Sequence, residues 1–522
     1  MSGWIQRPIQ GLHNAAGLLV GVLGGDGREY AVTVSKFASA AGRKKLPLVG
    51  LHDPVTGLLV GVRDAFGNES GVTATAQAVG GGRLATLMGM HDNTNALVGV
   101  YGGGDGTEYS ASFSGSVGAS PLRFASPYNY LMTSVGVQPT TTLINGRGRM
   151  PFYIGSGDMS QLVLSFIGWY MGGGGGGGAI PLNNAYNIVK IAVEKDGASG
   201  SVPVTFGGLR TKTINPLDND VQSDPILPSS FSLPKFTRGD KYWIRFEYSV
   251  ASNTQFMPTG PLNYVSVGFP AAVSVFIDPA ANDMSPVDSF GQMNFTTGWN
   301  NNYQVPMLPF VLGRAVSGDL RSILTVGTSI VAGFGTGASQ AYFNSDLVSN
   351  PLAGANFGLG GSSGTIWNLT NPAILAAWFK YAKYVMDEYG TNQFLNPPGS
   401  LTGAQTDSQY IWNTAKANGV SAILRPKLIP RTTAAPFDGT TPLNSAWASG
   451  GNARLFNDWL DTQTANVTLM TRNSLRAGST QSTDAFYQWT GGVTNTADGT
   501  HPNTAGYLLD AVDFRAGFAL LP

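Results

Sequence analysis

The stretch ILTVGTSIVAGFG, from Ile323 to Gly335, decides how the C-terminal part of the chain is interpreted. It opens with an apolar, β-branched run that is typical of a buried strand, and the run stops at Gly327. A hydroxyl pair, Thr328 and Ser329, follows at once, and a further glycine stands at Gly333. A strand that ends in glycine and hydroxyl residues indicates either an ordinary turn or the position of a nucleophile.

Short apolar runs alternate with candidate helices from this stretch to the C-terminus. The runs are SILTV, ANFGL, YVMDEYG, VSAILRP and VTLMTRN, and the helical segments cover 372–383, 402–419, 450–463 and 504–521. Strands that alternate with helices predict an α/β domain with a parallel sheet over residues 318–522. Sites in such sheets form at the carboxyl ends of the strands. Ser329 stands at that end of the first strand, which favours a nucleophile.

A serine nucleophile needs a base, and the histidines restrict the choice. Three of the four histidines lie near the N-terminus, so His501 is the base available in the α/β region. It lies in TADGTHPNTAGY, where Asp498 precedes it by three residues. On a tight turn this spacing lets a carboxylate reach the imidazole. Taken alone, DGTHPN also fits an ordinary turn in which Thr504 caps the last helix.

Two further segments offer hydrogen-bond donors for an oxyanion. NFGLGGSSG (Asn356–Gly364) follows the second strand, and its glycines let a backbone N–H face a ligand. EYGTNQ (Glu388–Gln393) ends the third strand and contains the side-chain amide of Asn392. Each segment alone is an ordinary loop composition, but four such segments at strand ends are hard to assign to chance.

The four segments together resemble the sequence blocks of the SGNH (GDSL-type) hydrolase superfamily, over about the last 200 residues. GTSIVAG resembles the first block, which implies that Ser329 is the nucleophile. DGTHPN resembles the last block, which implies that Asp498 and His501 are the acid and the base. The resemblance implies a three-layer α/β fold and hydrolysis of carboxylic esters without a metal or cofactor.

The middle blocks of the resemblance concern the oxyanion. NFGLGGSS and YGTNQ imply an oxyanion hole made by the Ser329 amide, the Gly361 amide (with Gly360 as its near alternative) and the Asn392 side chain. Two positions depart from the family pattern. The aspartate that normally precedes the serine is Thr328, and the aspartate that normally follows the block-three asparagine is Gln393. Loss of the first aspartate changes how the serine loop is held, and reduced or lost activity is the expected consequence of a poorly held loop.

The first region, residues 1–119, is repetitive. GLHNAAGLLVGV, GLHDPVTGLLVGV and GMHDNTNALVGV place His13, His52 and His91 at a spacing of 39 residues. Each unit alternates apolar and small residues before a Gly/Asp cluster, which predicts three β-hairpins that need neighbouring repeats or other chains to complete a core. Equivalent histidines in stacked repeats lie a repeat apart, so hydrogen bonding at turns explains them better than a shared metal site.

The central region, residues 120–317, is β-rich without repeats. YWIRFEYSV (Tyr242–Val250) alternates apolar and polar residues, YVSVGF and VSVFI are further strand candidates, and the loops are rich in proline and asparagine. This pattern predicts an antiparallel β-sandwich, with an accessory or glycan-binding role. Seven glycines at 172–178 lack the Lys-Ser/Thr context of a phosphate loop and indicate a flexible loop or a close backbone approach.

Composition restricts the setting. Lys+Arg and Asp+Glu both number 31, so no basic footprint for nucleic acid is present, and zero cysteines exclude disulfides and thiolate sites. The N-terminus lacks the pattern of a secretion signal, and the longest apolar run is about half of a membrane span, so no membrane insertion is expected. Only 12% of residues are charged, and 70 glycines are about twice the usual share.

These features together resemble a bacteriophage virion protein. The resemblance implies a tail fibre, tailspike or similar appendage that forms a homotrimer. Its repeats are expected to contact other virion proteins. Its activity is expected to remove acyl groups, O-acetyl above all, from a host surface polysaccharide. Two alternatives stay open: an SGNH scaffold without catalysis that serves as a structural or receptor-binding virion protein, and a cellular carbohydrate esterase or lipase.

Overall fold

The computed structural model describes residues 5–8, 10–13, 19–23, 29–31, 34–36, 44–52, 59–64, 69–71, 75–76, 83–91, 97–102, 107–111, 121–127, 129–130, 134–136, 145–172, 177–252, 257–261, 274–277, 287–291, 299–300, 304–306, 309–316, 318–333, 352–395, 399–432, 444–496 and 498–522. The chain divides into two compact units. The first is Met1–Ser120 with Ala315–Gly318, and the second is Pro121–Arg314 with Asp319–Pro522.

The first unit is an antiparallel sheet in which three hairpins share one register. Gly11 pairs with Val22 in the hairpin of β2 (Gln10–His13) and β3 (Leu19–Leu23). The equivalent pairs are 50 with 62 in the hairpin of β6 (Lys44–His52) and β7 (Leu59–Asp64), and 89 with 100 in that of β10 (Arg83–His91) and β11 (Leu97–Gly102). Each hairpin has a register irregularity just before its histidine, at 12/13, 51/52 and 90/91. Strand β10 also pairs with β6 and with β2, so the hairpins join one another. The hydrogen bonds expected of the His13, His52 and His91 side chains lie outside the described part.

The strands of this unit are β1 (Ile5–Pro8), β2 (Gln10–His13), β3 (Leu19–Leu23), β4 (Glu29–Ala31), β5 (Val34–Lys36), β6 (Lys44–His52), β7 (Leu59–Asp64), β8 (Glu69–Gly71), β9 (Thr75–Ala76), β10 (Arg83–His91), β11 (Leu97–Gly102) and β12 (Thr107–Ala111).

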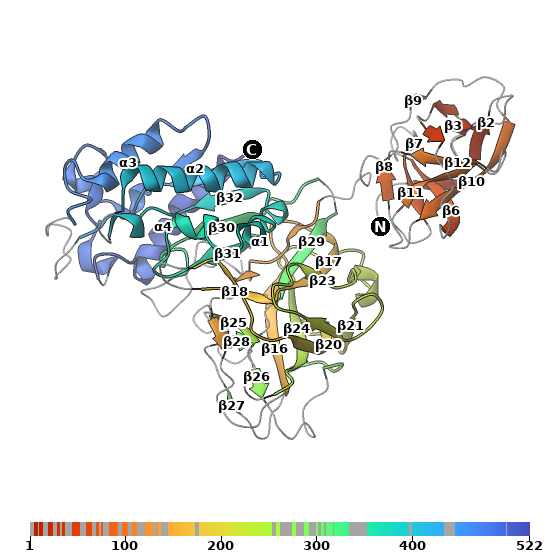
Figure 1. Ribbon diagram of the computed structural model, residues 1–522, viewed down its shortest axis with the longest axis horizontal. Helices are drawn as coiled ribbons and strands as arrows, with labels where there is room; N and C mark the ends of the chain where they lie inside the picture. The colour runs from red at the N-terminus through yellow and green to blue at the C-terminus, as the bar shows by residue number, and fades with distance from the viewer. Residues whose placement is uncertain are drawn as a thin grey trace. The chain divides into compact units, whose positions relative to one another are not determined.

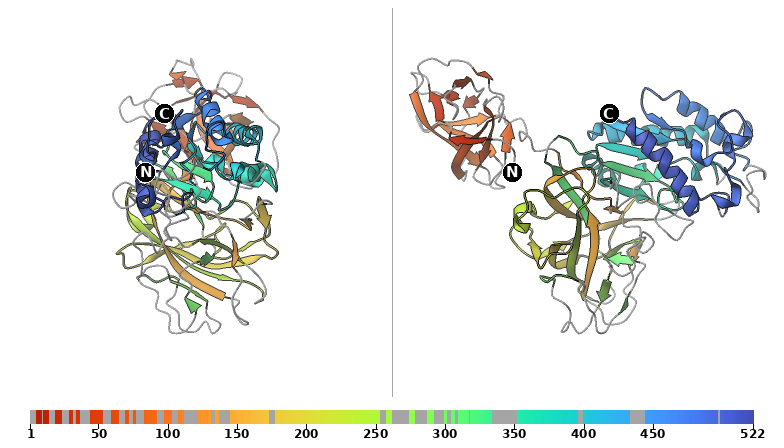
Figure 2. Two further views of the ribbon diagram at one scale, coloured as in Figure 1. Left: turned by 90° about the vertical axis from the view of Figure 1, so that its left-hand side faces the viewer. Right: turned by 180° about the vertical axis from the view of Figure 1, so that it is seen from behind.

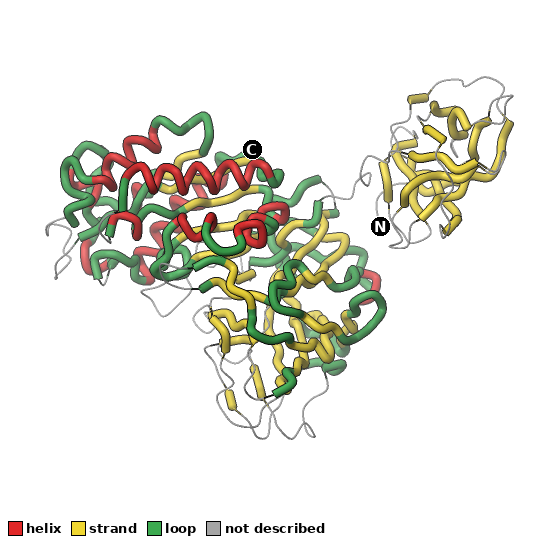
Figure 3. Tube along the Cα trace, in the orientation of Figure 1, coloured by secondary structure: helices red, strands yellow, loops and turns green. Residues whose placement is uncertain are grey.

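The second unit begins with several antiparallel sheets. A seven-stranded sheet has the order β21-β20-β24-β16-β26-β27 with β22 beside β20, and a four-stranded sheet has the order β13-β29-β17-β23. A three-stranded sheet, β15-β25-β28, and the pair β18-β19 complete the set. Within the described residues this region holds a single short helical turn, and the other helices all follow residue 360 (Figure 3). The predicted strand YVSVGF and most of the glycine run at 172–178 lie outside the described residues.

The strands of this region are β13 (Arg123–Phe124), β14 (Asn129–Tyr130), β15 (Ser134–Gly136), β16 (Asn145–Tyr153), β17 (Met159–Phe166), β18 (Trp169–Met171), β19 (Ala179–Pro181), β20 (Tyr186–Lys195), β21 (Ser201–Val204), β22 (Lys212–Ile214), β23 (Val221–Gln222), β24 (Lys241–Ser249), β25 (Met257–Pro261), β26 (Ser274–Ile277), β27 (Trp299–Asn300), β28 (Gln304–Pro306) and β29 (Phe310–Ala315), and the helical turn is η1 (Pro228–Phe231).

Strand β24 is covered on both faces, so the clean alternation expected for it is wrong. Every residue from 242 to 246 is buried, including the charged Arg245. The Arg245 guanidinium and that of Arg149 both bind the buried carboxylate of Glu194, at 2.9 and 2.8 Å. A charge that is paired in this way can face the interior, because its hydrogen-bonding needs are met there.

The C-terminal region forms a parallel sheet of six strands in the order β14-β31-β30-β32-β33-β34. The strands are β30 (Ile323–Gly327), β31 (Gly354–Gly358), β32 (Tyr384–Asp387), β33 (Ala422–Pro426) and β34 (Thr468–Met470). Helix α2 (Leu401–Ala417) lies on one face with α3 (Asn452–Asp461) beside it (Figure 1), and α4 (Thr504–Ala519) crosses the other face (Figure 2, right). A core joins the sheet to α4 through Ile323, Tyr384, Met386, Leu424, Phe514 and Phe518.

The helix expected over 372–383 is interrupted. The structure has α1 (Pro372–Ala376) and then a 3-10 turn, η4 (Phe379–Tyr381). Trp378, Phe379 and Tyr381 are all buried, and one face of a straight helix is too narrow to bury three aromatic side chains at this spacing. The other short 3-10 turns of this region are η3 (Gly364–Asn368), η5 (Asn392–Phe394), η6 (Asn473–Leu475), η7 (Asp484–Tyr487) and η8 (Gly492–Thr494).

The antiparallel and parallel regions are joined by backbone and side chains. Strand β14 pairs in parallel with β31, so a segment near residue 130 supplies the edge of the C-terminal sheet. The buried Asn129 amide donates to the carbonyls of Ser126 and Gly354 at 2.8 and 2.9 Å, and Arg123 binds the carboxylate of Asp319 and the carbonyl of Ala382. These contacts explain why residues 121–314 and 319–522 form one compact unit, while the boundaries at 119 and 317 stay predictions.

Candidate active site

Ser329 lies in the turn that follows β30, at the point where the strand order reverses. Strand β30 lies between β31 and β32, and all five of its residues are buried. In an open parallel sheet, the crevice beyond the carboxyl end of such a strand is the usual position of a ligand site. A Cβ at Gly327 would meet Val331 Cγ2 at 2.5 Å, so only glycine fits at the strand end. Gly333 has a φ of +82°, a conformation that favours glycine.

The structure brings Ser329, His501 and Asp498 together. Ser329 Oγ lies 2.8 Å from His501 Nε2, and His501 Nδ1 lies 2.6 Å from Asp498 Oδ2. An ionised carboxylate only accepts hydrogen bonds, so the Nδ1 atom carries the imidazole proton and Nε2 is left to accept from the serine hydroxyl. This is the hydrogen-bond order of a serine nucleophile with its base and orienting acid.

The loop that carries Asp498 and His501 is held by hydrogen bonds between its own side chains and its backbone. Asp498 Oδ1 accepts from the amides of Thr500 and His501, at 2.8 and 2.7 Å. The Thr496 hydroxyl donates to the His501 carbonyl and accepts from the Gly499 amide. Helix α4 then begins at 504, and its cap is Asn503, whose Oδ1 accepts from the amide of residue 506 at 3.1 Å. The capping role expected of Thr504 therefore belongs to the residue before it.

Asp498 is electrostatically suited to hold the imidazole. Burial opposes its ionisation, but hydrogen bonds from the His501 imidazole and from the amides of His501 and Thr500 outweigh burial and lower the pKa of Asp498 to about 2. The carboxylate therefore stays charged throughout the neutral range. The Ser329 residue is 8% exposed, and the side chains of His501 and Asp498 are 24% and 50% exposed, so the pair approaches a shielded nucleophile from the solvent side.

The expected oxyanion donors lie on the loops after the neighbouring strands. Gly361 follows β31 with a φ of +74°, a conformation that suits glycine. The Asn392 amide follows β32 and donates to the Ser362 carbonyl at 2.8 Å. The Leu359 amide donates to the carbonyl of Gly327 at 3.0 Å, which ties this loop to the end of β30. The loops after β31 and β32 are therefore joined to each other, and the loop after β31 is joined to the end of the strand that precedes Ser329.

Both departures from the family pattern have a carboxylate partner from another segment. Thr328 Oγ1 donates to Glu388 Oε2 at 2.9 Å. Gln393 Nε2 donates to Asp407 Oδ2 at 3.1 Å, and the Thr365 hydroxyl donates to the same oxygen at 2.7 Å. Sequence reasoning missed Glu388 and Asp407, because neither lies next to its partner in the chain. The faint signal was a pair of acidic residues, Asp387 and Glu388, at the end of an otherwise apolar strand segment.

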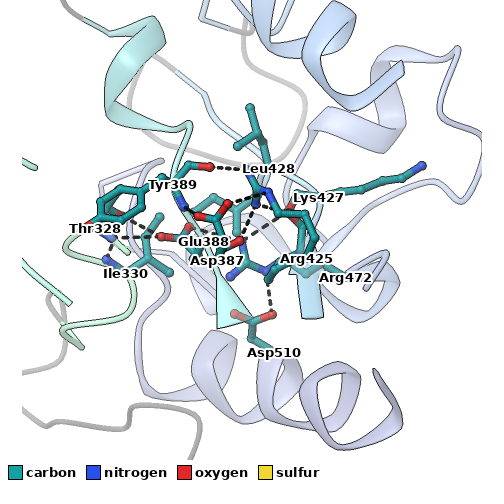
Figure 4. Close-up of polar contacts among 12 residues, drawn as sticks. Thr328, Ile330, Asp387, Glu388, Tyr389, Arg425, Lys427, Leu428, Arg472 and Asp510 are labelled. Atoms are coloured by element: carbon teal, nitrogen blue, oxygen red, sulfur yellow. Dashed lines mark hydrogen bonds and ion pairs between the residues drawn. The ribbon is translucent and has the colours of Figure 1, made fainter. Parts of the chain in front are cut away.

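Beneath the serine turn lies a buried cluster of charges (Figure 4). Arg472 Nη1 lies 3.4 Å from Glu388 Oε1, and Arg472 Nε lies 3.1 Å from Asp510 Oδ1 on α4. Next to Glu388, Asp387 accepts from the amide of Tyr389, and the Arg425 guanidinium lies 3.5 Å away. Burial raises the pKa of Asp387, and Arg425 opposes that rise. The carboxyl ends of β32 and β33 and the start of η6 are thus linked by ion pairs.

The described residues contain no group of three or more histidine, aspartate or glutamate side chains arranged to hold a metal ion. Over the same residues, none of the helices combines the length and the apolar character needed to cross a membrane.

No protein-family model matches this sequence, and no curated protein matches it. Solved structures with a similar fold include a GDSL-like lipase from Bacteroides thetaiotaomicron, which is 15% identical with a TM-score of 0.27 and is matched over 38% of this chain and 88% of that chain. Another is an acetylxylan esterase from Geobacillus stearothermophilus, which is 14% identical with a TM-score of 0.29, over 38% and 94%. At these values the likeness assigns no chemistry, which has to come from the site itself.

Proposed function

We propose that the chain is a serine esterase that hydrolyses carboxylic esters, with Ser329, His501 and Asp498 as its catalytic residues. The observation that carries the proposal is the hydrogen-bonded series from Ser329 Oγ to His501 Nε2 at 2.8 Å and from His501 Nδ1 to Asp498 Oδ2 at 2.6 Å. An ordinary turn has no need of a serine aligned on an imidazole that a carboxylate orients.

The geometry supports a two-step acyl transfer. Ser329 Oγ attacks the ester carbonyl while its proton moves to His501 Nε2, and Asp498 stabilises the imidazolium that results. The oxyanion is stabilised by the amides of Ser329 and Gly361 and by the Asn392 side chain. Collapse of the tetrahedral intermediate breaks the ester C–O bond, and His501 gives its proton to the leaving alcohol. Water, deprotonated by His501, then attacks the acyl-enzyme and releases the carboxylic acid and Ser329.

The decisive test is Ser329→Ala with an aryl acetate as substrate. We expect kcat/KM to fall by about 10³-fold or more, because the acyl-enzyme can no longer form. Ser229→Ala, at an exposed serine of the antiparallel region, is the control and should keep wild-type activity. A Ser329→Ala protein as active as the wild type would refute the mechanism. A serine-reactive fluorophosphonate that fails to label the folded wild type would favour the alternative of a non-catalytic scaffold.

We also propose a setting and a substrate class: a bacteriophage surface appendage that removes O-acetyl groups from a host surface polysaccharide. The support is compositional: a cysteine-free, glycine-rich chain of low charge with β-structure ahead of the esterase region. Release of acetate from purified capsule or O-antigen tests the substrate, and no release across a panel of acetylated glycans would count against it. Mass photometry tests the expected homotrimer, and a monomer at micromolar concentration would contradict it.

A further inference from the structure

Thr328 and Glu388 form a fully buried pair directly beside the nucleophile. Both residues are 0% exposed. The Thr328 hydroxyl donates to Glu388 Oε2 at 2.9 Å, and the Thr328 amide donates to the same oxygen at 3.2 Å. Glu388 is itself fixed to the strand before the serine, because its amide donates to the Val326 carbonyl at 2.9 Å. The carboxylate therefore holds Thr328, the residue before Ser329, through two hydrogen bonds.

The same hydroxyl also reaches the residue after the nucleophile. The Ile330 amide donates to Thr328 Oγ1 at 3.3 Å, and the Tyr507 hydroxyl of α4 donates to the Ile330 carbonyl at 3.0 Å. Both neighbours of Ser329 in the chain are thus fixed through polar contacts, one to Glu388 and the other to Thr328 and α4. A short turn that is held on both sides leaves its central side chain little freedom to move.

The direction of these hydrogen bonds is determined by the proton count. A hydroxyl has one hydrogen, which Thr328 gives to Glu388, so its lone pairs are free to accept from Ile330. Among the described residues, three hydrogen bonds reach the Glu388 carboxyl, and all come from donors: the hydroxyl and amide of Thr328 on Oε2, and Arg472 Nη1 on Oε1 at 3.4 Å. A set of donors alone is the environment of an ionised carboxylate, with Arg472 supplying the opposite charge (Figure 4).

The space around the pair is fitted to this arrangement. A Cβ at Gly327 would lie 2.9 Å from Glu388 Oε2, so glycine at the strand end is what allows the carboxylate to approach the turn. The space at Gly327 and the hydrogen bonds to Glu388 thus both favour the same position of the carboxylate.

From these contacts we infer that Glu388 is a positioning residue, which acts through the Thr328 hydroxyl to aim Ser329 at His501. The inference rests on the proposed esterase activity. The opposing explanation is that Glu388 serves the fold alone, as one member of the ion-pair cluster with Arg472 and Asp510. The two explanations differ in what they predict for the hydroxyl, because Thr328 takes no part in the ion pairs.

The first experiment removes the hydroxyl and keeps the shape, by Thr328→Val. We expect kcat for an aryl acetate to fall about 10- to 100-fold with KM little changed, because a slightly misaimed nucleophile loses rate rather than binding. Thr328→Ser keeps the hydroxyl and should recover most of the lost rate. Thr325→Val is the matched control, since Thr325 is equally buried, in the strand that leads into this turn, but bonds the Ala355 carbonyl, and it should keep wild-type kcat. Wild-type kcat in Thr328→Val would overturn the inference.

The second experiment moves the charge across the pair. Thr328→Asp places two buried carboxylates in contact, which raises the pKa at which they lose a shared proton. Above that pKa the two charges repel each other, so we expect the activity of this variant to fall as the pH rises and its pH profile to shift toward acid. The double variant Thr328→Asp/Glu388→Gln restores the number of buried charges and reverses the direction of the hydrogen bond. We expect it to regain at least about tenfold of the rate lost at neutral pH. A double variant no more active than the single variant, although folded, would overturn the inference.

A stability cycle separates this inference from the proposed function. Urea unfolding of the wild type, Thr328→Val, Glu388→Gln and the double variant Thr328→Val/Glu388→Gln reports whether the two side chains interact, whatever the protein catalyses. Non-additive effects in a protein that neither hydrolyses esters nor labels with fluorophosphonate would refute the esterase and the positioning role that depends on it, while showing that the contact exists. Full hydrolysis with additive effects, and with wild-type kcat in Thr328→Val, would refute the positioning pair and leave the esterase standing.

Discussion

At the scale of single residues, the site depends on how Asp498 is solvated. The carboxylate is half exposed, yet it accepts two backbone amides and the imidazole N–H, and these donors hold the charge in place. It therefore fixes the tautomer of His501 without a deeply buried charge. Asp498 could be predicted from the sequence, because the acid, the turn and the base lie within four consecutive residues.

Asp498 should leave a signature in the acid stability of the protein. Its folded-state pKa of about 2 lies below the unfolded value of about 3.9, so the ionised group stabilises the fold above about pH 4, and this contribution is lost as the pH falls toward 2. We expect wild type to be more stable than Asp498→Asn above about pH 5, with the difference shrinking between about pH 4 and 2. Urea unfolding across this range measures it, and a difference that grows on acidification would contradict it.

At the scale of elements, the sheet order explains which parts of the site could be predicted. Strands β30 to β34 could be predicted, because short apolar runs alternate with helical segments. His501 could be predicted, because the other three histidines lie near the N-terminus. The partners of Thr328 and Gln393 could not be predicted, since Glu388 is 60 residues from Thr328 and its role depends on the side-by-side pairing of β30 and β32. Strand β14 was missed for a similar reason, because two residues carry no periodicity and their pairing is decided by the tertiary fold.

The last position of β30, Gly327, should not tolerate a side chain. Gly327→Ala brings a methyl group within 2.5 Å of Val331 Cγ2 and 2.9 Å of Glu388 Oε2. We expect a loss of about 1–3 kcal/mol in the free energy of unfolding, together with lower esterase activity. Gly200→Ala is the matched control, because a Cβ there meets nothing within 4 Å, and it should stay close to wild type. Equal stabilities of the two variants in urea would contradict the expectation.

At the scale of the whole molecule, the candidate esterase is built into the structure ahead of it. The C-terminal sheet takes its edge strand from β14. The Asn129 amide bonds to the carbonyls of Val311 and Gly354, on the two sides of residue 317, and the Arg123 guanidinium bonds to the Ala382 carbonyl. A boundary at 318 follows naturally from composition, because the period changes there. Composition, however, indicates which strands and helices form but not which strands pair with each other in a sheet.

A fragment that begins at 318 should therefore be impaired, whereas one that begins at 121 should fold. The shorter fragment loses the edge strand and several buried hydrogen bonds, each worth about 1 kcal/mol. We expect it to be insoluble or to melt at least about 10 °C below the fragment 121–522, which should retain aryl acetate hydrolysis. Circular dichroism melting and activity assays compare the two. Equal melting temperatures would show that the parallel region is independent.

The edge strand also sets an order on the folding of the nascent chain. Asn129 bonds to a carbonyl 225 residues further along, so β14 leaves the ribosome long before the strand that it must join. The antiparallel sheets between the two can form during that wait, and they shorten the loop that remains to be closed. The parallel sheet is then closed late, by a contact between residues far apart in sequence, which slows folding. We therefore expect changes at the contact between β14 and β31 to appear first as slow, low-yield refolding, even when the folded protein behaves like wild type.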